Sequence, residues 1–218
     1  MRKTLSLLLS SMLFLAFSCT KPDNGDNTGN NDGPETSLKV GDYYSSGLVK
    51  GIVFSLDEDG EHGLVVSLDE KNLQWSTLET SVIAGAAYVS LDYGLDNVMG
   101  IKSLFDNWAT AFPAVAWCSS KNPGSLNLWY LPAANELRTL LDGFAGNPGL
   151  AASMEQHSGT PLNPLSSYWS STDGGGQIAY SYRHRADMSP DEDLYALLPK
   201  SESLPSRCIY RFWFLTEI

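Results

Sequence analysis

Residues 129–143 read WYLPAANELRTLLDG, and this stretch determines much of the expected fold. Proline fits the first turn of a helix, where its missing amide proton would have no intrahelical partner, so we expect a helix to begin near Pro132. Glu136 lies early in this helix, where a carboxylate complements the helix dipole, and Gly143 is a typical helix end. The residues that predict the helix between them are Ala133, Ala134, Leu137, Leu140 and Leu141.

Two further helices are expected around this one. Over residues 97–112 the apolar side chains fall on one face at helical spacing, and Pro113 follows directly. Asp96 or Asn97 is the expected N-cap of that helix. A short helix is predicted over 150–156. The aromatic stripe of the longer helix is expected to pack in the core, and it consists of Phe105, Trp108 and Phe112.

Segments rich in β-branched and aromatic residues lie on both sides of the helices. Residues 47–54 and 63–68 flank an Asp-Gly turn and predict a hairpin, and residues 168–172 and 177–183 predict two strands around a glycine turn. The apolar segment 207–215 is expected to be a central strand, covered on both faces for much of its length. Strands, then helices, then strands predict an α+β domain with antiparallel sheets.

The amino-terminal residues are typical of an export signal. A charged start is followed by an apolar run of about 13 residues, too short to span a bilayer, which needs roughly 20. The sequence LAFSC at 15–19 resembles a bacterial lipobox, so we expect a signal peptide over 1–18 and a lipid anchor on Cys19. An ordinary secretory signal with a stray cysteine is the alternative. Residues 19–37 are polar and predict a flexible tether to a domain over 38–218.

The net charge of the chain limits the classes of partner that are expected. The net charge is −11, and loss of Arg2 and Lys3 with the signal peptide leaves 12 basic against 25 acidic residues, a net charge of −13. Nucleic acid and anionic lipid are therefore not expected as partners, and the membrane is expected only through the lipid anchor. Acidic residues soon after Cys19 are similar to signals that place lipoproteins on the exterior of some Gram-negative cells. We expect an outer-membrane, cell-surface location.

Two cysteines remain once Cys19 carries lipid. An even number of cysteines in an exported chain favours a disulfide between Cys118 and Cys208. Two separate buried thiols are the alternative, because sequence does not show their geometry.

Four segments in a fixed order resemble the Lcl C-terminal domain family. This family is a domain of unknown function with a C-type-lectin-like fold, distantly related to formylglycine-generating enzymes. The resemblance implies that fold for residues 38–218, and it implies a lectin-fold disulfide at Cys118 and Cys208. The segments are AWC at 116–118, WYLP at 129–132 with EL at 136–137, YWSST at 168–172 and RCIYR at 207–211.

The resemblance favours a non-catalytic recognition or adhesion domain that binds a glycan or a protein. In such folds variable loops on a rigid frame carry recognition. The expected binding region is residues 173–205, in which aromatic side chains have polar neighbours. A solvated loop without a ligand is the alternative for each position. The candidate ligand-binding residues are Gln177, Tyr182, Arg183, His184 and Asp187.

No metal or cofactor is expected. The Glu-Pro-Asn-like and Trp-Asn-Asp-like calcium motifs of true C-type lectins are not found in the sequence, and the acidic run at 187–193 is expected to be solvated. The related enzymes need a reactive thiol pair, whereas both remaining cysteines are expected to be structural. His62, His157 and His184 lack metal-binding spacing. An enzyme is therefore the less favoured hypothesis, and a structural or accessory subunit of a surface filament or outer-membrane complex is the main alternative.

Overall fold

The computed structural model describes residues 38–58, 60, 62–78, 88–187 and 194–213. All of these belong to one unit, Thr36–Ile218. The expected signal peptide, the anchor residue Cys19 and the tether 19–37 lie outside the described residues. In the described part of the chain, no helix combines the length and the apolar character needed to cross a membrane.

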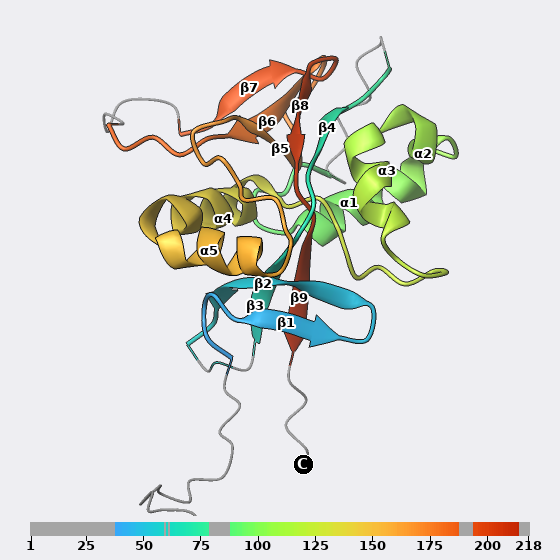
Figure 1. Ribbon diagram of the computed structural model, residues 1–218. Coiled ribbons are helices and arrows are strands. Elements are labelled where there is room, and N and C mark those ends of the chain that lie inside the picture. Colours follow the sequence, from blue (N-terminus) through green and yellow to red (C-terminus); the bar gives the residue numbers. More distant parts are fainter. Residues whose placement is uncertain (1–37, 59, 61, 79–87, 188–193, 214–218) are drawn as a thin grey trace, which may run out of the picture. The chain divides into compact units, whose positions relative to one another are not determined.

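A four-stranded antiparallel sheet forms one end of the domain (Figure 1). Its two middle strands are the expected hairpin, which is confirmed, with Gly51 opposite Ser67 and Leu56 opposite Gly63. A bulge between Val53 and Ser55 shifts the register within this pair. In spatial order the strands are β1 (Tyr43–Ser46), β2 (Val49–Leu56), β3 (His62–Ser67) and β9 (Ile209–Trp213).

The expectation that the carboxy-terminal strand is central is wrong. β9 pairs with β3 on one side only, and on its other side a single bridge joins Ile209 to Tyr130. Its apolar sequence has a different cause: the side chains of Cys208, Ile209 and Phe212 are buried in the core. Burial of the faces of β9 therefore does not require a second neighbouring strand.

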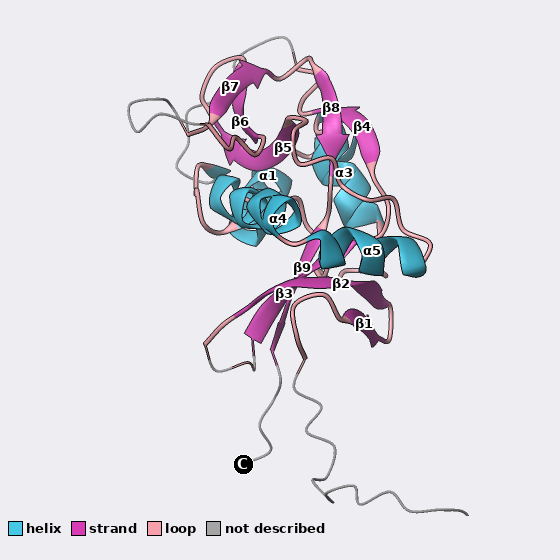
Figure 2. Cartoon of the chain, turned by 60° about the vertical axis from the view of Figure 1, so that its left-hand side comes forward, coloured by secondary structure: helices cyan, strands magenta, loops and turns pink. Residues whose placement is uncertain are grey.

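Two smaller antiparallel sheets lie at the opposite end of the domain (Figures 1 and 2). The strands expected over 168–172 and 177–183 are confirmed as β5 and β6. One sheet has the order β5 (Tyr168–Asp173), β6 (Ile178–Tyr182) and β7 (Ala196–Pro199), and the other pairs β4 (Lys71–Gln74) with β8 (Ser203–Ser206). The expected α+β class with antiparallel sheets is thus confirmed.

The single helix expected over 97–112 is instead several helices. The chain adopts an extended conformation at Phe105 (φ −126°, ψ 109°). In an unbroken helix Phe105 and Phe112 would lie about 10 Å apart along the axis, but the break brings their ring centroids within 4.9 Å in the core. The three helices that result are α1 (Gly94–Leu104), α2 (Trp108–Ala111) and α3 (Pro113–Ser120).

The N-cap expected at Asp96 or Asn97 is also wrong, because Tyr93 occupies that position. Asn97 is buried inside α1. Its side-chain oxygen accepts a hydrogen bond from the amide of Ser90 (2.9 Å), and its side-chain nitrogen donates to the Ser90 carbonyl (2.8 Å). The asparagine thus fixes the chain that leads into α1.

The helix expected over 132–143 is displaced by two to three residues, to α4 (Ala134–Gly146). Pro132 lies outside it because its carbonyl accepts a hydrogen bond from the amide of Ser171 (2.7 Å). Gly143 lies inside it, and the helix ends where Asn147 precedes a proline, since that position disfavours helical backbone. The proline begins α5 (Pro148–Gln156), which confirms the short helix expected over 150–156.

α4 lies between the four-stranded sheet and the sheet of β5, β6 and β7 (Figures 1 and 2). It contacts β2 on one side and β5 and β6 on the other. Leu137, Leu140, Leu141 and Phe144 are buried along α4, so this helix joins the two ends of the domain through one hydrophobic core.

The expected disulfide is confirmed. Cys118 in α3 and Cys208, which directly precedes β9, form a disulfide across a Cα–Cα distance of 5.3 Å, and both residues are fully buried. The bond connects positions 90 residues apart in sequence. It therefore restricts a large loop in the unfolded chain.

Removal of this disulfide should lower stability substantially. We expect a Cys118→Ala/Cys208→Ala variant to lose about 4 to 5 kcal/mol of unfolding free energy, because a loop of this length loses much conformational entropy when it is closed. Urea denaturation of the variant and of the reduced wild-type protein measures the loss. A difference below about 1 kcal/mol would show that the disulfide contributes little to stability.

Candidate functional site

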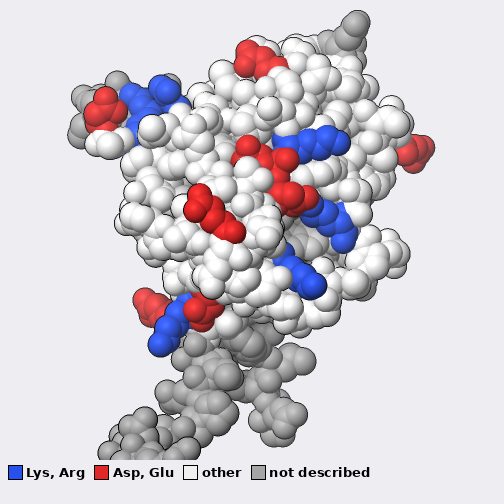
Figure 3. All heavy atoms as spheres, in the orientation of Figure 1, with Lys and Arg blue, Asp and Glu red and all other residues white. Residues whose placement is uncertain are grey.

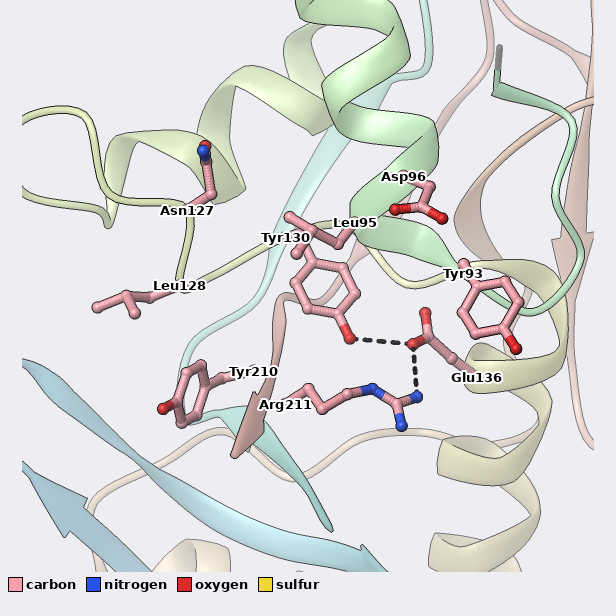
Figure 4. A pocket seen from close by; sticks show the side chains of 9 residues that line it. All are labelled: Tyr93, Leu95, Asp96, Asn127, Leu128, Tyr130, Glu136, Tyr210 and Arg211. Carbon is pink, nitrogen blue, oxygen red and sulfur yellow. Dashed lines mark hydrogen bonds and ion pairs between the residues drawn. The ribbon is translucent and has the colours of Figure 1, made fainter. Parts of the chain in front are cut away.

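A buried carboxylate joins three elements of the fold at the start of α4. Glu136 Oε1 accepts a hydrogen bond from the Tyr130 hydroxyl (2.9 Å) and lies 3.3 Å from Nη2 of Arg211 on β9. Its Oε2 accepts hydrogen bonds from the amides of Ala133 (2.9 Å) and Gly94 (3.1 Å), the latter at the start of α1. We call these five residues the Glu136 junction; its side-chain contacts are drawn in Figure 4.

Burial dominates the electrostatics of the junction. Glu136 is 6% exposed. Burial raises its pKa above the ordinary value, and the hydrogen bonds from Ala133 and Tyr130 and the charge of Arg211 oppose that rise. Burial and the neighbouring carboxylate also raise the pKa of Tyr130. The junction is therefore a fixed polar group surrounded by low-dielectric protein.

Three of the four segments that carry the resemblance lie at or beside this junction. Tyr130 exchanges two backbone hydrogen bonds with Ile209 of β9 (3.0 and 2.9 Å). Thr172 Oγ1 of β5 accepts a hydrogen bond from the amide of Ala134, the first residue of α4 (3.1 Å). The helix start is thus capped by a side chain far along the sequence, because its own N-cap, Ala133, has no side-chain acceptor.

A pocket of about 310 Å³ opens beside the junction (Figure 4). Its walls are mainly apolar or aromatic and come from the start of α1, the loop before Trp129, and β9. Tyr130, Glu136 and Arg211 supply polar groups, and Arg211 is one-third exposed. The other lining residues are Tyr93, Leu95, Asp96, Asn127, Leu128 and Tyr210. Apolar walls with a few fixed polar groups are typical of ligand-binding sites.

Two of the sequence-derived candidates, Tyr182 and His184, come together away from this pocket. Asp142 Oδ1 on α4 accepts a hydrogen bond from the Tyr182 hydroxyl and lies at the same distance from His184 Nδ1, 2.7 Å in each case. Tyr182 is 5% exposed. Burial and the Asp142 carboxylate raise its pKa, so this hydroxyl is a structural donor.

The remaining candidates do not join them in one site. Gln177 is exposed before the first residue of β6, whereas Tyr182 is the last residue of that strand. Gln177 lines a separate cavity of about 400 Å³ with Gln74 and Ser201. Arg183 and Asp187 are exposed in the chain that follows β6. The structure thus places Gln177 just before β6 and the other four candidates at its last residue or beyond, and their role in binding remains a prediction.

The residues of the pocket were missed as ligand-binding candidates. The sequence alone identifies Glu136 only as a charge that complements the helix dipole, and Arg211 and Tyr130 only as parts of the segments that resemble a family. The available signal was an acidic residue in the first turn of the helix that follows WYLP, together with an arginine in an otherwise apolar strand. Predicting that Glu136 and Arg211 form an ion pair requires knowing that β9 lies beside Tyr130, which no local sequence pattern shows. Among the described residues, no group of three or more His, Cys, Asp or Glu is arranged to hold a metal ion.

Comparison with known proteins gives a likeness in fold. No protein-family model matches the chain, and no curated protein matches it. Among solved structures, the chain is similar to a fimbrial protein from Bacteroides ovatus ATCC 8483, with a TM-score of 0.57 and 18% sequence identity. The match covers 81% of this chain and 49% of that protein, so this chain spans about half of its length. At this identity the similarity establishes a shared fold.

Closure of the Glu136 junction requires glycine at position 94. A Cβ atom there would lie 2.5 Å from the Ala133 nitrogen and 2.7 Å from Glu136 Oε2. We expect Gly94→Ala to lower the free energy of unfolding by about 1 to 3 kcal/mol, although alanine is the better helix former.

Gly146→Ala is the matched control, because Gly146 is also helical and a Cβ there would meet nothing within 4 Å. That variant should be as stable as the wild type or more stable by up to about 1 kcal/mol. Chemical denaturation of both variants measures the contrast. Equal effects would contradict the tight packing of Gly94 against the junction.

Proposed function

We propose that this protein is an exported, lipid-anchored surface protein whose C-type-lectin-like domain recognises a ligand without catalysis. The observation that carries the proposal is the pocket beside the Glu136 junction. Its aromatic and aliphatic walls would pack on a ligand, while buried polar groups held by several hydrogen bonds would set the ligand's orientation. A rigid site of this kind suits selective binding, because little order has to be gained when the ligand binds.

The proposed anchor rests on the sequence around Cys19. Residues 19–37 are rich in Asn, Asp and Gly and contain no large apolar side chain. The described domain begins and ends at the four-stranded sheet (Figure 1). A lipidated Cys19 would hold the domain at a membrane and leave its other surfaces accessible.

A second candidate function is an accessory subunit of a surface filament. The likeness to a fimbrial protein over 81% of the chain favours it. The two functions are compatible, since a filament subunit can also carry a binding site. Recovery of the chain in a large detergent-solubilised assembly would support the filament function, and recovery as a monomer would count against it.

Tyr93 provides a direct test of the pocket. It lines the pocket and is 61% exposed, so Tyr93→Ala should fold normally. We expect the full-length protein in detergent to bind members of a glycan array, and the variant to bind them at least about tenfold more weakly, a loss of about 1.4 kcal/mol.

Leu165→Ala is the control, because Leu165 is 66% exposed and does not line the pocket. It should bind as the wild type does. Equal binding by all three proteins would place recognition elsewhere on the surface. An array without any bound glycan would contradict glycan recognition altogether.

Lipidation is tested at Cys19. Cells grown with an alkyne-tagged fatty acid should incorporate the tag into the wild-type protein but not into Cys19→Ala, since the anchor requires that thiol. Fluorescence of the tagged protein on a gel measures the incorporation. Equal labelling of the two proteins, or none in either, would contradict the proposed anchor.

A further inference from the structure

Apolar side chains are exposed along α1 and beside it. Among the described residues, six of the ten large apolar side chains that are exposed lie between positions 89 and 126. Monomeric proteins rarely expose large contiguous apolar areas, and such areas often mark an interface with another protein. The six side chains are those of Val89, Leu91, Tyr93, Met99, Leu104 and Leu126.

Part of this apolar surface is continuous. Tyr93 lines the pocket beside the Glu136 junction, and Met99 and Leu126 line a neighbouring cavity of about 270 Å³. Asn127 is a wall of both hollows. The three exposed side chains therefore lie on one surface of the domain.

This surface follows one side of α1. Leu95 and Asp96 in the first turn line the pocket (Figure 4), and Met99 and Lys102 line the cavity. Residues three and four positions apart are neighbours on the surface of a helix. We use the name α1 face for the surface formed by Tyr93, Leu95, Asp96, Met99, Lys102 and Leu126.

Two opposite charges on the α1 face have no oppositely charged partner in the described part of the chain. The Asp96 carboxylate is exposed and contacts no cation there. The Lys102 ammonium lies 3.0 Å from Asn127 Oδ1 and 4.9 Å from the centroid of the Trp108 ring. Burial lowers the pKa of Lys102, because neither neighbour carries a full negative charge.

Other charges on the surface are paired within the chain. Lys121 contacts Asp69, and Nε of Arg138 lies 3.5 Å from Oδ2 of Asp142. In the middle of the face drawn in Figure 3, basic and acidic side chains lie beside one another. The two charges of the α1 face thus differ from these, and a second molecule could supply their partners.

The two charges are placed symmetrically about Met99. Asp96 lies three residues before it and Lys102 three residues after it, about 4.5 Å along the axis in each direction. If two copies of α1 pack antiparallel about a two-fold axis at Met99, Asp96 of each copy faces Lys102 of the other. Packed helix axes lie about 8 to 10 Å apart, a gap that these two side chains can span.

We propose that the α1 face is the interface of a two-fold symmetric dimer of this chain. The two α1 helices pack antiparallel with Met99 at the axis, and Asp96 of each copy pairs with Lys102 of the other. The apolar side chains on either side of this contact are covered by the second copy. The α1 face suits a copy of itself because it is complementary to itself in both charge and apolar character.

This inference goes beyond the proposed recognition function and does not depend on a ligand. A dimer would carry two pockets, one at the amino-terminal end of each α1. A ligand with repeated units could engage both, which raises its overall affinity without any new contact in either pocket.

Charge reversal tests the proposed pairing. The association of the full-length protein in detergent is measured by sedimentation equilibrium, with the solvent density matched to that of the detergent. We expect a monomer–dimer equilibrium. Symmetry turns each single reversal, Asp96→Lys or Lys102→Glu, into two repulsive contacts, so each should raise the dissociation constant at least about tenfold, a change of about 1.4 kcal/mol.

The double variant and a control assign this effect to the pair. Asp96→Lys/Lys102→Glu restores two opposite-charge contacts and should return the dissociation constant to within about threefold of the wild-type value. Lys71→Glu, at an exposed lysine on β4, makes the same change of charge as Lys102→Glu and should leave the dissociation constant unchanged. Thermal unfolding of each variant checks that it is folded.

A cross-link tests the position of the axis. Facing Cα atoms of helices that are 8 to 10 Å apart come within about 4 to 6 Å, a distance that a disulfide can bridge. Met99→Cys should therefore form a covalent dimer in intact cells, seen on a non-reducing gel. Leu197→Cys, at an exposed position on β7, is the control and should stay monomeric.

The outcomes separate the inference from the proposed function. A monomer at every concentration, a trimer or larger assembly, or a dimer that the double variant does not restore overturns the two-fold interface. A Met99→Cys protein that stays monomeric or is cross-linked to a different protein does so too. Glycan binding that depends on Tyr93 in a monomeric protein would leave the proposed function intact.

Discussion

The buried carboxylate of Glu136 needs hydrogen-bond partners in the folded protein. Its two oxygens accept hydrogen bonds from Tyr130, Ala133 and Gly94 and form an ion pair with Arg211. These groups belong to the starts of α1 and α4, to the segment between them, and to the last strand. A buried carboxylate without partners would be strongly unfavourable, so the carboxylate favours one relative placement of these elements.

The position of β9 at a sheet edge makes this arrangement available. β9 pairs with β3 along one edge, and along its other edge it has only the bridge to Tyr130. In a central strand, a second strand would occupy that edge. The pocket lies beside this edge, lined by Tyr210 and Arg211 from the strand and by α1 across from it. The disulfide at Cys208 fixes the start of the same strand to α3.

Local patterns predicted the parts of the fold that depend on local physics. The β2–β3 hairpin, β5 and β6 and the antiparallel α+β class all follow from periodicity and turn residues. Local patterns did not predict the break in the helix at Phe105, because that break is stabilised by a contact with Phe112 in the core. The candidate site was not predicted either. Tyr182 and His184, two of the predicted ligand-binding residues, both contact Asp142, and Glu136 and Arg211, 75 residues apart, meet only through the tertiary fold.

Native-state hydrogen exchange of backbone amides tests most directly whether the Glu136 junction is a fixed part of the fold. The amides of Gly94 and Ala133 donate to the buried carboxylate, and the amide of Ile209 donates to Tyr130 in the adjoining core. If the junction is a fixed part of the fold, all three amides should exchange with the same opening free energy, that of global unfolding. Exchange of Gly94 and Ala133 near the rate of unprotected amides, with Ile209 still protected, would contradict it.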